Sequence, residues 1–347
     1  MNSIISILVA VLMFGVIVLV HEFGHFFFAR RNGITVEEFA IGMGPKVVGK
    51  KVGDTLFSIR ALPFGGFCKL LGEDEVVADE NAYSSKSVWA KIQVVIGGPL
   101  FNMLLAFVFA VIFLLISGRV ITPVVTEVKE NSPAEAAGLQ IGDKIVEIND
   151  KKIIAYSEVQ IYINENKGQP IDLTYKRDGL KIEKVITPEF IEEYNTYQIG
   201  IVPDTVKMNN PINVIKYAFI EIVFWIKMVF YGLGMLLSGA ISANEIAGPV
   251  GIVTVVSEGY KSSIQIGLLS VIKTISFFII LLSANLGVMN LLPIPALDGG
   301  RLVFLIIEAI RRKPMNEERE GTIHFIGYIL LMVLMVVVLF NDVRKLF

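Results

Sequence analysis

The sequence is short of cysteine, histidine and charge. Cys68 is the only cysteine among 347 residues, which excludes an internal disulfide and a zinc site built from several thiolates. Charged residues make up only 18% of the chain, the net charge is −2 and no basic stripe is present, so we expect no nucleic-acid partner. The chain has three histidines, and two of them lie one helical turn apart.

Apolar residues, by contrast, are abundant. A hydrophobic fraction of 54% and a mean hydropathy of +0.64 predict an integral membrane protein. We expect four transmembrane helices, in the apolar runs 4–29, 92–118, 274–297 and 322–341. The first run lacks a basic n-region and a small-residue cleavage site, so we expect it to be retained rather than removed as a signal peptide.

The first apolar run ends in the motif His21-Glu22-Phe-Gly-His25. On a helix, His21 and His25 project from nearly the same face and can both bind one zinc ion. Glu22 lies close enough to take a proton from a water molecule on the metal. A five-residue match also arises by chance, but ionisable groups inside an apolar span are costly to insert and are rarely idle. The motif therefore predicts a hydrolytic zinc site.

A hydrolytic zinc ion needs a third protein ligand, and Asp298 is the best candidate. It ends the third apolar run just after Pro293 and Pro295, which interrupt the helix. Interrupted backbone at membrane depth is tolerated where it lines a cavity. Taken alone, the position would be explained by an Asp-Gly turn at a helix end, but its pairing with the first motif favours a metal ligand. His324 has no partner at helical spacing, so we expect a structural role for it.

Basic residues predict which ends of the spans face the cytoplasm. They gather in the loop 30–91 and again just after Asp298, which places both sides of the zinc site toward the cytoplasm. Asp298 and the two histidines lie on the same side of the bilayer only if the apolar stretch 211–240 does not cross it. That stretch contains Lys216, Glu221 and Lys227. We therefore predict a membrane-surface helix there, on the extracytoplasmic side.

Two further stretches have both a structural and a functional interpretation. Residues 55–71 predict two short strands with a hairpin turn at Gly65-Gly66, either a plain cytoplasmic hairpin or one that dips toward the metal. In the second span, the small residues Gly97 and Gly98 allow close helix packing. Asn102 follows them, either as an interhelical hydrogen-bonding group or as a donor to a substrate carbonyl.

Residues 119–205 differ in character from the apolar runs. We predict strands at 124–128, 144–148, 171–175 and 182–186, and a helix at 157–166. The elements Pro-Ala…Ala-Gly-Leu, ending at Leu139, and Gly-Asp-Lys-Ile, starting at Gly142, resemble a PDZ domain. The resemblance implies a groove that captures a peptide or C-terminus by strand addition. The alternative is a small globular domain without a binding role.

Three motifs together resemble those of the site-2 proteases, which are intramembrane zinc metalloproteases: HEFGH, GGPLFN and NLLPIPALDGG. The single PDZ-like insertion is similar to the RseP-type bacterial subfamily. The resemblance implies that His21, His25 and Asp298 bind Zn2+ and that Glu22 is the catalytic base. It also implies that Asn102 and Asn290 position the substrate, and that the hairpin at Gly65 and Gly66 pairs with it. Many relatives have His where this chain has Arg301.

The expected molecule is an α-helical integral membrane protein with four transmembrane helices. It carries an inserted extracytoplasmic α/β PDZ domain and a cytoplasm-side, membrane-associated β-hairpin. The expected divisions are 1–118, with spans one and two; 119–205, PDZ-like; 206–265, extracytoplasmic helices; and 266–347, with spans three and four. Family resemblance implies a bacterial plasma membrane, with single-pass membrane proteins as substrates and the PDZ domain as a size filter. A metal transporter and a non-catalytic PDZ scaffold are the alternatives.

Overall fold

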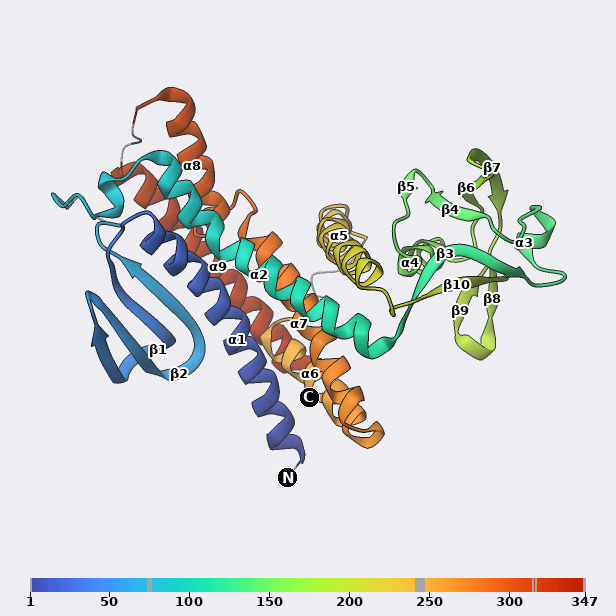
Figure 1. Ribbon diagram of the computed structural model, residues 1–347, viewed down its shortest axis with the longest axis horizontal. Helices are drawn as coiled ribbons and strands as arrows, with labels where there is room; N and C mark the ends of the chain where they lie inside the picture. The colour runs from blue at the N-terminus through green and yellow to red at the C-terminus, as the bar shows by residue number, and fades with distance from the viewer. Residues whose placement is uncertain (1, 74–76, 241–246, 314, 316, 346–347) are drawn as a thin grey trace. The chain divides into compact units, whose positions relative to one another are not determined.

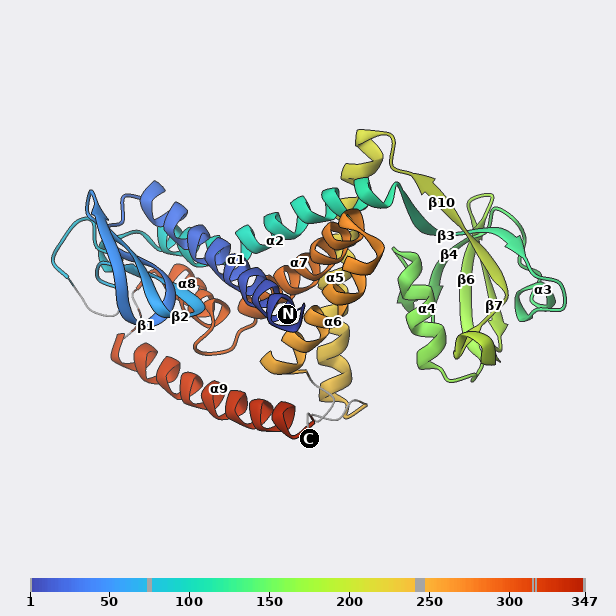
Figure 2. The same ribbon diagram turned by 90° about the horizontal axis from the view of Figure 1, so that it is seen from below.

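The computed structural model describes residues 2–73, 77–240, 247–313, 315 and 317–345. The chain divides into two compact units, one formed by residues 1–110 and 225–347 and the other by residues 111–224 (Figures 1 and 2). The first unit contains every residue of the expected zinc site. The second contains the PDZ-like segment.

The described helices are α1 (Asn2–Arg31), α2 (Val88–Ser117), α3 (Pro133–Ala136), α4 (Tyr156–Glu165), α5 (Pro211–Leu237), α6 (Pro249–Ile266), α7 (Leu268–Asn290), α8 (Asp298–Arg311) and α9 (Glu317–Lys345). The described strands are β1 (Val36–Val52), β2 (Thr55–Leu70), β3 (Arg119–Val128), β4 (Lys144–Ile148), β5 (Lys151–Lys152), β6 (Ile171–Arg177), β7 (Leu180–Ile186), β8 (Glu189–Ile191), β9 (Thr196–Gln198) and β10 (Ile201–Lys207).

Helix α1 is the centre of the first unit. Ala10, Met13 and Ile17 recur at helical spacing and form one buried face of α1. That face packs against Val256 of α6 and Phe278 of α7. Helix α6 therefore belongs to the packed core around α1. From the sequence it was expected among the extracytoplasmic helices of residues 206–265.

Helices α1 and α2 meet backbone to backbone, as the glycines predicted. A Cβ added to Gly24 would lie 2.2 Å from the carbonyl oxygen of Gly97, closer than any side chain tolerates. Helix α7 approaches α2 on another side, where the Ser283 hydroxyl donates a 2.9 Å hydrogen bond to the carbonyl of Asn102. The motifs of α1 and α2 are thereby brought together beside α7.

The predicted turn at Gly65-Gly66 is wrong. The chain reverses at residues 53–54, where Val52 pairs with Thr55, and both glycines lie inside β2. β1 and β2 are long, bent strands. Ala40 of β1 pairs with Ser58 and also with Phe67, so the two halves of β2 flank the first half of β1. Residues 66–70 thus form one edge of this sheet.

The second unit is a β-rich, PDZ-like domain. Its main sheet has the order β10-β3-β4-β6-β7, with β5 paired to β4. All four predicted strands and the predicted helix are confirmed, while the short strands β8 and β9 and the edge strand β10 were not predicted. Asp143 of the Gly-Asp-Lys-Ile element is fully buried and accepts two 2.8 Å hydrogen bonds from Arg177. This ion pair links the loop before β4 to β6.

Five described helices are long and apolar enough to cross a membrane: α1, α2, α5, α7 and α9. The apolar runs and basic loops of the sequence predict four crossings, with residues 211–240 at the membrane surface. Helix α5 is continuous from Pro211 to Leu237. Length and composition make a helix able to cross but do not determine whether it does, so the number of crossings stays a prediction.

Candidate metal centre

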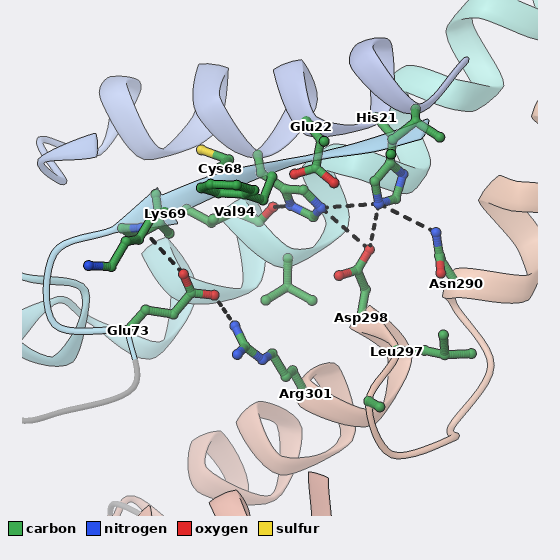
Figure 3. A pocket seen from close by; sticks show the side chains of 18 of the residues that line it. His21, Glu22, Cys68, Lys69, Glu73, Val94, Asn290, Leu297, Asp298 and Arg301 are labelled. Atoms are coloured by element: carbon green, nitrogen blue, oxygen red, sulfur yellow. Dashed lines mark hydrogen bonds and ion pairs between the residues drawn. The ribbon is translucent and has the colours of Figure 1, made fainter. Parts of the chain in front are cut away.

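Three side chains converge in the first unit, from helices far apart in the sequence. His21 and His25 come from α1, and Asp298 is the first residue of α8. The His21 Nε2 and His25 Nε2 atoms lie 3.2 Å apart. The Asp298 Oδ2 atom lies 3.2 Å from the first of these nitrogens and 3.5 Å from the second (Figure 3). Within the described part of the chain, these residues form the one such group able to hold a metal ion.

The spacing of these three atoms matches the demands of zinc. Ligand atoms 2.0–2.1 Å from a tetrahedral ion are about 3.3 Å from one another. The three separations, between 3.2 and 3.5 Å, bracket that value. Two imidazoles and one carboxylate are also the donor set of many hydrolytic zinc sites. The residues therefore fit a zinc ion.

The hydrogen bonds behind the histidines fix how the rings are turned. The His25 Nδ1 donates to the carbonyl oxygen of Val94 at 2.8 Å, which leaves its Nε2 lone pair directed at the site. The His21 Nδ1 lies 3.2 Å from the Asn102 amide. Both contacts come from α2, so this helix orients the two metal-facing imidazoles.

Gly98 provides the space for the two rings. A Cβ added there would lie 2.4 Å from His25 Nε2 and 2.7 Å from His21 Cε1. We expect Gly98→Ala to push the imidazoles out of register and to weaken zinc binding by at least about tenfold, as loss of ligand orientation does elsewhere. The measurement is a zinc titration of the purified protein against a chromophoric chelator.

Gly15→Ala is the matched control, because nothing lies within 4 Å of a Cβ added at Gly15 on α1. It should bind zinc like the wild type. Unchanged zinc affinity in Gly98→Ala would show that the two imidazole rings do not depend on the space left by Gly98.

A cavity of about 510 Å³ opens beside the three converging residues. Glu22 extends from α1 into it, next to the two histidines (Figure 3). Asn290 lines it from the end of α7, with its amide nitrogen 3.4 Å from His21 Nε2. Gly65 and Gly66 of β2 also line it, and a Cβ added at Gly66 would be 3.5 Å from the Glu22 side chain. The predicted residues, apart from Asn102, thus share one cavity.

Asn102 does not lie where a residue that touches substrate would be expected. Its side chain is fully buried behind His21, and it does not line the cavity. Its Oδ1 atom has no hydrogen-bond partner in the described part of the chain. Asn102 therefore faces a histidine rather than the space in which a substrate would lie.

Other residues of the cavity were not predicted. Glu73 and Arg301 form an ion pair that links the segment after β2 to α8 (Figure 3). Glu73 has no periodic or motif context, so no sequence signal could have found this pair. The Val94 carbonyl is a backbone group that carries no signal of its own. Cys68 also lines the cavity, but burial raises the pKa of its thiol, which disfavours a nucleophilic role.

Comparison with known proteins places the whole chain in a family. The family model "Peptidase family M50" matches residues 9–334. A putative zinc metalloprotease of Clostridium acetobutylicum is 39% identical over 343 residues, covering 98% of each chain. The regulator of sigma-W protease RasP of Bacillus subtilis is 31% identical over 425 residues, covering 99% of each chain. A PDZ domain from an SdrC-like protein of Listeria monocytogenes is 28% identical, with a TM-score of 0.22, and covers 24% of this chain and 85% of that one.

The family match and the relatives both span nearly the whole sequence, including the helices that carry all three motifs. The Clostridium acetobutylicum relative is named as a putative zinc metalloprotease and the Bacillus subtilis relative as a protease. The residues at the centre of the first unit have the donor set and spacing that zinc requires. This chain belongs to peptidase family M50, the site-2 protease family, and is a zinc metalloprotease.

Proposed function

We propose that the protein hydrolyses peptide bonds within the membrane, with His21, His25 and Asp298 as the zinc ligands and Glu22 as the catalytic base. The observation that carries this proposal is the convergence of three ligand atoms, from α1 and α8, at the mutual spacing of a tetrahedral zinc site. Two of these ligands lie on an apolar helix whose composition suits a membrane span.

The chemistry divides among the residues of the cavity. When bound, zinc supplies the Lewis acidity that polarises a scissile carbonyl and activates water. Glu22 takes the proton of the attacking water and delivers it to the leaving amine. Asn290 faces the same space and donates to the substrate. Asn102 acts through His21, whose Nδ1 lies 3.2 Å from the Asn102 amide nitrogen. Turning the Asn102 amide by 180° places the unpaired Oδ1 there as an acceptor from Nδ1–H, which leaves the Nε2 lone pair for the metal.

The substrate class follows from the setting of the site. A transmembrane helix has its amides satisfied internally, so it must unwind locally before its carbonyls can be attacked. Residues 66–70 form a sheet edge along the cavity, which would offer an unwound segment new backbone partners. The same sheet exposes apolar side chains such as Val47, Val48 and Ile59, which suits contact with lipid. Single-pass membrane proteins are therefore the proposed substrates.

The proposed topology keeps four crossings, with residues 211–240 at the extracytoplasmic surface. It assigns the cavity to the cytoplasmic side of a bacterial plasma membrane and the PDZ-like domain to the outer side. The support is the basic character of residues 30–91 and of the segment after Asp298. The domain then excludes substrates that retain a bulky outer portion, and its groove receives a peptide or C-terminus.

A reconstituted cleavage assay tests this function. The wild type is expected to cut a single-pass substrate whose outer domain has been removed and to spare the same substrate with that domain intact. A chelator should stop the reaction, and added zinc should restore it. Deletion of residues 122–204 should allow cleavage of the intact substrate while cleavage of the trimmed one continues. Intact substrate that stays uncut by the deletion variant would contradict the filter, whereas trimmed substrate left uncut by the wild type would contradict intramembrane proteolysis.

A further inference from the structure

The turn that leads into Asp298 has an unusual backbone. The Leu297 N–H donates to the Ile294 carbonyl at 3.2 Å, with Pro295 and Ala296 between them. Ala296 has a φ of +75°, as at the third position of a type II turn, where glycine is the usual residue. A residue with a Cβ is disfavoured in this conformation. Something outside the turn must therefore hold it.

His324 of α9 supplies that support. Its Nδ1 accepts a 2.9 Å hydrogen bond from the Ala296 N–H, so the ring proton is on Nε2. The ring of Phe304, on the helix that Asp298 begins, meets the His324 ring edge-on at 5.6 Å between centroids. In a type I turn the central peptide is reversed, and this N–H would point away from His324. The hydrogen bond thus selects the type II form.

Gly327, one turn further along α9, lets the helix approach the turn. A Cβ added there would lie 2.5 Å from the Pro295 Cβ and 2.7 Å from the Pro295 carbonyl oxygen. Residues three apart on a helix share one face, so Gly327 and His324 act on the same turn. Helix α9 therefore holds the turn by close packing and by one directed hydrogen bond.

We propose that His324 is a positioning residue for the metal ligand Asp298. Resting on the proposed function, this inference assigns to α9 the task of fixing the backbone that immediately precedes the carboxylate. A metal ligand must be held within about 0.5 Å of its working position, and reversal of the 295–296 peptide would displace Leu297 and Asp298 together. His324 does not touch the metal site itself; it acts through the Ala296 peptide.

The test compares zinc affinity among variants of the full-length protein in detergent micelles, titrated with Zn2+ against a chromophoric chelator. His324→Phe keeps a ring against Phe304 but removes the acceptor, and should raise the zinc dissociation constant about tenfold, the scale of other indirect ligand contacts. His324→Asn, whose amide oxygen can occupy the place of Nδ1, should restore most of the affinity. Adding Ala296→Gly to His324→Phe should also restore it, because glycine adopts positive φ unaided.

Control variants separate positioning from general packing. Tyr328→Phe, at an exposed position one turn beyond His324, should bind zinc like the wild type. Gly327→Ala should weaken zinc binding with His324 intact, which keeps the proposal testable should His324→Phe not fold. Melting temperatures measured without zinc identify variants that are merely unstable.

The outcomes are distinct from those that bear on the proposed function. If His21→Ala loses zinc while His324→Phe and Gly327→Ala bind like the wild type, the metal site stands and the positioning role is overturned. The role is also overturned if His324→Phe is weakened but neither His324→Asn nor Ala296→Gly restores affinity. If His21→Ala binds zinc as well as the wild type, the proposed metal site itself is wrong.

Discussion

Glu22→Gln is expected to abolish proteolysis while leaving zinc binding intact. Glutamine has the size of glutamate but cannot accept the proton of the attacking water, and removing a general base costs about 10² to 10⁴ in rate. The carboxylate does not belong to the three atoms whose spacing fits the metal, so the zinc content should remain one per chain. The measurement is cleavage of a reconstituted single-pass substrate by both proteins, with zinc determined in each preparation.

Glu73→Gln makes a useful contrast, because Glu73 is a second carboxylate of the same cavity. It is held by Arg301, and we expect its replacement to reduce cleavage far less than that of Glu22. Equal cleavage by the wild type and Glu22→Gln would indicate a contaminating protease. Loss of metal flux rather than of proteolysis would indicate a transporter.

Asp298→Ala is expected to lose both zinc and activity. Removing a direct ligand should weaken zinc binding by more than about 100-fold, beyond the range seen for indirect contacts. Asp298→Asn should behave similarly, because a neutral amide is a weaker donor than a carboxylate. Metal analysis after gel filtration, together with the cleavage assay, measures both effects.

Glu308→Gln is the control for Asp298, since Glu308 lies on the same helix but lines a separate hollow with Trp89 and Lys313. It should retain zinc and activity. One zinc per chain in Asp298→Ala would mean that the third ligand is another residue, and the remaining carboxylates of the cavity would then be tested in turn.

The centre of the site could be predicted from the sequence because its residues belong to short local motifs. His21, Glu22 and His25 lie within five consecutive residues of one helix, and Asp298 follows an apolar run interrupted by prolines. The small residues of the second span likewise predicted a close contact, which the backbone approach of Gly24 to Gly97 confirms. The four strands of the PDZ-like domain were also found by their alternating pattern.

What could not be predicted depends on contacts between distant residues. The sheet of β1 and β2 pairs Ala40 with both Ser58 and Phe67, and no local pattern distinguishes that arrangement from a simple hairpin. A glycine pair inside β2 looks like a turn in the sequence, although it lies where the strand changes from one side of β1 to the other. Likewise, His324 meets Ala296 across 28 positions, so the support for the turn before Asp298 appears only in three dimensions.

The ion pair between Glu73 and Arg301 also determines the charge balance of the cavity. Because these two side chains neutralise each other, the ionised carboxylates of Glu22 and Asp298 leave two negative charges among apolar helices. A divalent cation cancels both, whereas two uncompensated charges of like sign in an apolar surrounding are strongly unfavourable. Loss of the cation is therefore expected to draw protons into this cavity. Zinc affinity should accordingly fall as the pH falls, because the cation and protons compete for the same groups.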